Sequence, residues 1–260
     1  MKVIKKIYVI FLALFFTSYA FAINAPCSAG TAYTLPKGYF EIGLFQPLRY
    51  GQTETLEWST HPILDLLIPN ITIKKAWRDF AGWDFATRHN ITYPTPLLRT
   101  ISRKGTGGII SPEFDIPQMF SLRNEVLLTR KFSPSFLITG KAGLTLAVTS
   151  DELDERTTID LPLVFPRLGV FYNGYAVNFG LDVGGDLTSR FAYLTDVDIF
   201  LLPGADENFA FEHKSLIIWN KSKKFQMMLG YKLVFGEYPF GKQWHLLPLF
   251  DMQWARQFRN

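Results

Sequence analysis

The stretch Trp244-His-Leu-Leu-Pro-Leu-Phe-Asp-Met-Gln-Trp-Ala-Arg-Gln-Phe258 decides the fold. Every second residue from Trp244 to Trp254 is apolar or aromatic, whereas the intervening residues turn polar from Asp251 onward. Because side chains alternate between the two faces of a β-strand, this pattern predicts one long strand with an apolar face. A tilted strand of about 9–11 residues crosses a bilayer, and this stretch exceeds that length.

The N-terminus has the composition of a secretion signal. Lysines within residues 2–6 precede an apolar run at 7–16, and Ala20-Phe21-Ala22 is a small-x-small cleavage site. We expect residues 1–22 to be a cleaved signal peptide, because the apolar run is shorter than the roughly 20 residues of a spanning helix. Removing three lysines leaves 24 basic against 23 acidic residues, so the charge does not indicate a nucleic-acid partner.

The single cysteine, Cys27, has no second thiol with which to form an internal disulfide. Pro26 stands where a lipoprotein signal would have a small residue, which disfavours lipid attachment.

The composition favours a membrane protein that crosses the bilayer with strands. Aromatic residues make up 16% of the chain, with 24 phenylalanines, yet the mean hydropathy is only +0.08. After residue 22 no run approaches eighteen apolar residues. A closed β-barrel then remains as the way to satisfy backbone polar groups in lipid, and such barrels place aromatic residues in an outer band.

Alternation like that of the terminal strand recurs at 136–148, 175–183 and 225–235. We therefore expect residues 38–260 to form one all-β domain, a transmembrane antiparallel up-and-down β-barrel. Turn signals give about twelve strands, with ten to fourteen as the range, since bacterial single-chain barrels have even numbers. Residues 23–37 lack periodicity and are expected to be a periplasmic or flexible leader.

Two segments interrupt the strand pattern. Residues 50–53, Tyr-Gly-Gln-Thr, are expected to form a tight turn. Residues 159–172 are apolar on both faces and contain Pro162 and Pro166, which favours an irregular or edge-like strand.

The alternation assigns side chains to the two sides of the barrel wall. Charged groups cannot face lipid cheaply, so those of the inward phase either line a watery channel or form a salt-bridged network that fills a narrow barrel. Five of the eight inward candidates are acidic, a weak indication of cation preference. The lumen-lining candidates are Glu41, Glu57, Arg123, Glu125, Lys141, Asp182, Lys232 and Asp251. The lipid-facing residues are expected to be Leu144, Val183, Leu229, Phe250 and Trp254.

Catalytic and metal-binding motifs have little support in this sequence. Ser59 and His61 would share a face of a strand, which is a chance spacing in a chain with many serines. The sequence lacks the usual zinc-ligand spacings, so we expect no metal, no cofactor and no enzymatic activity. The acidic stretch at 151–155 would either bind divalent cations at the lipopolysaccharide surface or be a solvated loop.

The longest gap without alternation is at 103–118, a length that is often functional in a loop. Its glycines let the chain fold back, and Ile110, Phe114 and Met119, with other apolar residues near it, need a surface to cover. We expect this segment to fold against or into the barrel mouth and narrow it. The alternative is that it packs on the rim or belongs to another strand pair.

The signal sequence, the alternating strands and the aromatic terminal strand together resemble Gram-negative outer-membrane β-barrel proteins. The segment Thr34-Leu-Pro-Lys-Gly-Tyr-Phe-Glu-Ile-Gly-Leu-Phe45 is similar to the opening of uncharacterised, porin-like barrels. The resemblance implies a bacterial outer-membrane location, outer-membrane lipids and lipopolysaccharide as surroundings, and insertion by the barrel-assembly machinery. Phe258, two residues before the C-terminus, would stand in for the terminal aromatic residue of many barrels.

The function we expect is a small or restricted pore for polar solutes. One alternative is a non-transporting barrel used for adhesion, envelope structure or lipid chemistry. Another is a soluble periplasmic β-sandwich or lipid carrier, which the apolar faces of 159–172 would suit.

Overall fold

The computed structural model describes residues 28–257 except 66–67, 106–109, 155–156, 158–163, 205, 207, 223 and 239–240. The expected signal peptide, Cys27 and Phe258 lie outside the described residues, as does the first part of the expected leader.

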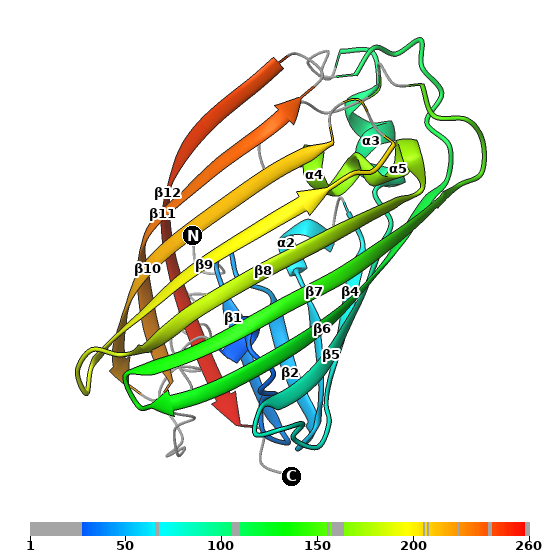
Figure 1. Cartoon of the computed structure of the whole chain (residues 1–260). Helices are drawn as coiled ribbons and strands as arrows, with labels where there is room; N and C mark the ends of the chain where they lie inside the picture. Colours follow the sequence, from blue (N-terminus) through cyan, green and yellow to red (C-terminus); the bar gives the residue numbers. More distant parts are fainter. Residues whose placement is uncertain are drawn as a thin grey trace, which may run out of the picture.

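The described residues form twelve antiparallel strands that close into a barrel (Figure 1), each paired with its neighbours in sequence and β1 with β12. The prediction of an all-β up-and-down barrel of about twelve strands is confirmed, and a β-sandwich is wrong. The strands are β1 (Tyr39–Gly43), β2 (Leu48–Thr53), β3 (Leu56–Thr60), β4 (Asn70–Ala76), β5 (Asp84–Thr92), β6 (Met119–Ser133), β7 (Phe136–Thr149), β8 (Tyr175–Asp186), β9 (Phe191–Leu201), β10 (Phe209–Ser222), β11 (Phe225–Tyr238) and β12 (Gly241–Gln257).

The two ends of the barrel differ. Tyr39 of β1 pairs with Gln257 of β12, so both chain ends of the barrel lie at one end, where the connections are short. We call this the turn end. The opposite end, the loop end, holds the long connections, and Figure 1 shows α3, α4 and α5 gathered there. Outer-membrane barrels have short periplasmic turns and longer extracellular loops, which gives the orientation.

The helical segments are short. They are η1 (Ser28–Gly30), α2 (Pro62–Asp65), α3 (Thr95–Ile101), α4 (Phe165–Leu168) and α5 (Val170–Asn173). None of the helices in the described part of the chain is long and apolar enough to cross a membrane.

The outer surface is apolar. The outward residues Leu144, Leu229 and Phe250 are 42%, 65% and 44% exposed, and Val183 and Trp254 are half-buried in the same phase. Side chains with this exposure on a closed barrel wall face the surroundings of the barrel, as expected for lipid contact.

Aromatic side chains gather in two belts on this surface. At the loop end, Trp244 contacts Phe211 and Phe235; at the turn end, Trp254 contacts Phe225. Trp244 and Trp254 are roughly ten residues apart along β12, which at ~3.3 Å per residue and a tilt of about 40° is about 25 Å. That is the height of the apolar band of an outer-membrane barrel.

The wall is uneven in height. Strands β1, β2 and β3 have five, six and five residues, whereas β12 has seventeen. Where β1 leaves β12, Asp251 Oδ1 accepts hydrogen bonds from the backbone N–H groups of Leu44 (2.9 Å) and Phe45 (3.2 Å). The carboxylate thus accepts from the backbone donors at the end of the β1–β12 ladder, and it explains why the inward phase of β12, which is apolar at Leu247 and Leu249, becomes acidic at this level.

Two local expectations are wrong. Residues 50–53 continue β2, and the turn follows at 54–55, because Arg49 and Gly51 both face the crowded interior. Of the expected strand at 159–172, residues 158–163 lie outside the described part, and the rest forms α4 and α5. Pro166 fits the first turn of α4, and Gly174 ends α5 with a positive φ of 84°.

A hydrophobic cluster at the loop end explains why this segment is apolar on all sides. Its buried members come from the β5–β6 connection and the start of β6, from α4 and α5, from β8 and from the residue after β9. They are Leu98, Ile110, Ile116, Met119, Phe165, Leu168, Val170, Phe171, Ala176 and Leu202. The apolar residues of 103–118 that are described therefore pack on α4 and α5.

Candidate functional site

The barrel encloses a cavity of ≈ 1330 Å³. At the turn end it is lined by Ser189, Arg190 and Lys224, and at the loop end by Gln46 and His61. The lining therefore reaches from one end of the barrel to the other.

Among the described residues, no member of 103–118 lines this cavity, whereas Pro166, Arg167 and Leu168 of α4 do. The described part of 103–118 therefore does not fold into the mouth, and its packing in the loop-end cluster agrees with the alternative that it lies on the rim. That segment supports the α4–α5 turns from behind, and α4 reaches the lumen.

The first ion-paired group lies beside β1–β4. Arg49 donates to Glu41 (2.8 Å) and to Glu57 (2.7 Å), and Lys74 Nζ lies 3.6 Å from Glu57. Glu57 also accepts the backbone N–H of Leu35 at 2.9 Å. Arg49, Glu57 and Lys74 are all buried, so the two cations depend on these carboxylates for compensation.

The second group lies across β5–β8. The Glu125 carboxylate accepts hydrogen bonds from the side chains of Arg88 (2.7 Å), Arg123 (2.5 Å) and Asn178 (3.0 Å). Gly143 makes the room for this contact, because a Cβ there would lie 2.6 Å from Glu125 Cγ.

The third group lies between β7, β8 and β9. Lys141 Nζ lies 2.6 Å from Asp182 and 2.7 Å from Asp198. A Cβ at Gly180 would meet Asp198 at 2.2 Å and Lys141 at 2.4 Å, so the ion pair requires glycine there.

The fourth group joins the loop end to β10 and β11. Glu212 is fully buried and binds Arg167 of α4 with both oxygens (2.6 and 3.0 Å) and Lys232 at 2.6 Å. The Arg167 guanidinium also lies over the Phe200 ring, 5.1 Å from its centroid. Bidentate pairing of this kind is directional, so Glu212 holds α4 in the lumen.

The segment 28–37 crosses the turn-end half of the lumen; we call it the inner segment. Lys74 Nζ donates to the carbonyls of Ser28 (3.0 Å) and Tyr33 (2.6 Å), and the Ala32 N–H donates to Thr129 at 2.8 Å. Gly51 is required where the segment passes β2, because a Cβ would lie 2.2 Å from the Pro36 oxygen. These contacts hold residues 28–37, the described part of the expected periplasmic or flexible leader, against the inner side of the barrel wall.

Tyr33 fastens the inner segment to the turn end of β5. Its hydroxyl donates to Asp84 at 2.9 Å. Burial and this carboxylate raise the pKa of Tyr33 to about 12.

The sequence-based lumen candidates all lie on the inner side of the wall. Seven of them line the cavity, namely Glu41, Glu57, Arg123, Glu125, Lys141, Asp182 and Lys232. Asp251 instead closes the β1–β12 ladder.

Among the described residues, sequence reasoning missed eight further charged residues of the interior that form ion pairs, which are Arg49, Lys74, Arg88, Arg167, Asp196, Asp198, Glu212 and Lys214. In the described part of the chain, the interior pairs join seven carboxylates to eight basic groups. The weak indication of cation preference loses its basis, because the additional basic groups offset the acidic excess.

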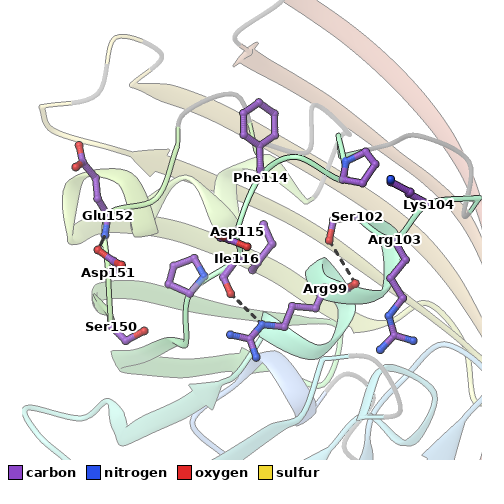
Figure 2. Close-up of a pocket in the computed structure, with 12 residues that line it drawn as sticks. Arg99, Ser102, Arg103, Lys104, Phe114, Asp115, Ile116, Ser150, Asp151 and Glu152 are labelled. Carbon is purple, nitrogen blue, oxygen red and sulfur yellow. Dashed lines mark hydrogen bonds between the residues drawn. The ribbon is translucent and has the colours of Figure 1, made fainter.

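A second pocket of ≈ 640 Å³ opens at the loop end (Figure 2). Arg103 and Lys104 lie on one side of it, and Asp151 and Glu152 on the other. Arg99 supports its floor by donating to the Ile116 carbonyl at 2.9 Å. In the described part of the acidic stretch, carboxylates share the pocket with basic groups, an arrangement that suits a solvated loop better than a cation site.

The structure places the residues of two other sites considered from the sequence, a Ser59–His61 nucleophile pair and a metal site. His61 Nε2 lies 3.0 Å from the Phe45 carbonyl oxygen, and Ser59 lines the cavity. Among the described residues, no group of three or more His, Cys, Asp or Glu is arranged to hold a metal ion.

No protein-family model matches the chain, and no curated protein matches it. Solved structures with a similar course include the outer membrane channel DcaP of Acinetobacter baumannii, at 9% identity and a TM-score of 0.38, covering 82% of this chain and 62% of DcaP. A bacterial polysaccharide outer membrane secretin matches at 7% identity and a TM-score of 0.42, covering 85% of this chain and 70% of the secretin. LpxR from Salmonella typhimurium matches at 8% identity and a TM-score of 0.39, covering 85% of this chain and 90% of LpxR.

The chain spans less than two thirds of the length of DcaP. Likeness at this level carries no argument about activity. The outward apolar band and the two aromatic belts carry the assignment, and the chain is an outer-membrane β-barrel.

Proposed function

We propose that this barrel is a restricted pore for small polar solutes. The observation that supports the proposal most directly is the cavity of ≈ 1330 Å³, because its lining residues belong to both ends of the barrel. Polar and charged side chains dominate this lining, as expected for a route that water and polar solutes can use.

Two parts of the chain restrict the route. The inner segment occupies the half of the turn end beside β2–β6, which leaves the side of Arg190 and Lys224 for passage. At the loop end, α4 enters the lumen and Arg167 crosses towards Glu212. Among the described residues that line the cavity, eleven are basic and seven are acidic, which predicts a modest preference for small anions over cations.

Replacing Arg167 with alanine is expected to accelerate the entry of small sugars and amino acids into vesicles that contain the refolded protein. Removal of the Arg167 side chain leaves space where α4 reaches the lumen, while Glu212 keeps Lys232 as a partner. Liposome swelling with solutes of increasing size measures the effect. Arg78→Ala, at an exposed turn-end arginine, is the matched control. Equal swelling rates for wild type and Arg167→Ala would contradict this placement of the restriction.

A non-transporting barrel is the second candidate. It is favoured by the extent to which charged groups are buried, since Lys74 is 2% exposed and Glu212 is 0% exposed. Vesicles with correctly folded protein that exclude the smallest solutes would favour it. For either function we propose outer-membrane lipids and lipopolysaccharide as the surroundings, and the barrel-assembly machinery as the route of insertion.

A further inference from the structure

A polar group interrupts the apolar outer face across β9, β10 and β11. The strand register places Ser215 directly between Thr195 and Tyr231, and His213 lies in the same outward phase. The next outward residue of β10, Ile217, is 49% exposed. These four polar side chains therefore belong to the surface that faces lipid, outside the cavity described above.

The four side chains are hydrogen-bonded to one another. His213 Nε2 lies 3.1 Å from the Tyr231 hydroxyl and 3.5 Å from Ser215 Oγ. Ser215 Oγ lies 3.0 Å from Thr195 Oγ1. His213 Nδ1 lies 3.2 Å from the main-chain oxygen of Asp196.

The Asp196 carbonyl determines which ring nitrogen carries the proton. A carbonyl oxygen can only accept, so the neutral imidazole donates from Nδ1 and presents Nε2 as the acceptor. Nε2 faces two hydroxyls, that of Tyr231 at 3.1 Å and that of Ser215 at 3.5 Å, and a serine hydroxyl within reach of an imidazole acceptor is the arrangement of a nucleophile and its general base. The 3.5 Å separation is long, as catalytic hydrogen bonds often are before substrate binds.

The depth of the group in the membrane identifies the class of substrate. His213 is two residues nearer the bilayer centre than Phe211, which belongs to the loop-end aromatic belt. At ~3.3 Å per residue and a tilt of about 40°, that is roughly 5 Å below the belt. Aromatic belts lie at headgroup level, so the pair lies where acyl chains of outer-leaflet lipids are joined to their headgroups through esters.

We propose that Ser215 and His213 hydrolyse an ester-linked acyl chain of an outer-leaflet lipid. Ionisable and polar residues that face the membrane interior are costly and usually functional, and here three strands supply them together. The activity is separate from the pore and does not depend on it.

The reaction balances with water as the co-reactant. Ser215 Oγ attacks the ester carbonyl while its proton passes to His213 Nε2, and collapse of the tetrahedral intermediate expels the lipid alcohol, which takes that proton. Water from the membrane interface then gives a proton to Nε2 and attacks the acyl-serine. The fatty acid leaves, and Ser215 regains its proton from His213.

The experiment uses the full chain refolded into detergent micelles, with folding checked by heat-modifiable gel migration. One arm contains hexa-acylated lipid A and the other a diacyl phosphatidylethanolamine, so the two sources of acyl ester are distinguished. Released fatty acid is measured by mass spectrometry. A fluorophosphonate probe, followed by peptide mapping, reports whether Ser215 is an activated nucleophile.

We expect release in at least one arm and labelling of Ser215. Ser215→Ala and His213→Asn should each lower the rate at least ~100-fold, and His213→Asn should also abolish labelling, which loss of a purely structural contact would not do. Ser59→Ala is the matched control, since Ser59 precedes His61 by two residues but lines the cavity. Folded wild type that releases no fatty acid from either lipid, or Ser215→Ala that releases it at the wild-type rate, overturns the proposal. Conductance, measured separately, tests the pore.

Discussion

Replacing Glu57 with alanine is expected to destabilise the folded barrel by about 3–5 kcal/mol, because it removes one partner of a buried ion-paired group. Arg49 and Lys74 would stay buried with less compensating charge, and the Leu35 N–H would lose its acceptor. The inner segment would therefore loosen at the same time. Urea unfolding of the refolded protein in micelles, followed by tryptophan fluorescence, measures the loss of free energy of unfolding.

Glu54→Ala is the matched control for this change, because Glu54 is an exposed carboxylate in the turn just before β3. Its removal should change the free energy of unfolding by less than about 1 kcal/mol. Similar losses for the two variants would mean that Glu57 does not hold the buried group together.

Replacing Leu144 with arginine is expected to impair membrane insertion by about 2–4 kcal/mol, the cost of a basic side chain near the bilayer midplane. Leu144 is 42% exposed on the outer face, whereas the next residue, Thr145, lines the cavity. Thr145→Arg should insert almost normally, since its side chain meets polar groups. The folded fraction in lipid vesicles, measured by heat-modifiable gel migration, separates the two.

Equal insertion of Leu144→Arg and Thr145→Arg would show that the outward and inward phases of β7 are wrongly assigned. Leu229, at 65% exposure on β11, provides an independent repeat of the first substitution. Its neighbour Gly230 is unsuitable as a control, because a Cβ there would lie 1.9 Å from the Ser215 carbonyl oxygen.

The long strands could be predicted because each of their faces meets a different environment. In β7, β8, β11 and β12 the alternation persists over enough residues to be recognised, and it placed Leu144 outside and Lys141 inside. The short strands were harder to recognise. In β2, six residues give only three alternations, and Gly51 within them looks like a turn residue until the passage of Pro36 over it is known.

The α4–α5 segment could not be identified for a different reason. A short apolar run that is buried on all sides has no period, so a strand and a helical turn cannot be told apart from it. Arg167 is the cavity-lining residue that this ambiguity concealed. Its partner Glu212 lies 45 residues away along the chain, and their pairing depends on the closed barrel.

The candidate site residues likewise divide into features that the sequence shows and features that depend on the closed barrel. The inward charges were visible residue by residue, but their partners across strands were not, which is why an acidic excess was inferred. Two His/Ser pairs with a spacing of two occur in the sequence, Ser59 with His61 and His213 with Ser215. Spacing alone does not distinguish them, and only the register that brings Tyr231 beside His213 does.

Single-channel recording in planar bilayers tests the central claim, that a restricted polar route passes through this barrel. With the refolded full chain, the account predicts discrete and steady current steps. It also predicts a reversal potential shifted towards the chloride equilibrium potential in a potassium chloride gradient, because basic residues outnumber acidic ones in the described cavity lining. Arg167→Ala should give larger steps. Bilayers that contain correctly folded protein but carry no current steps at any applied voltage would contradict the claim and leave a sealed barrel.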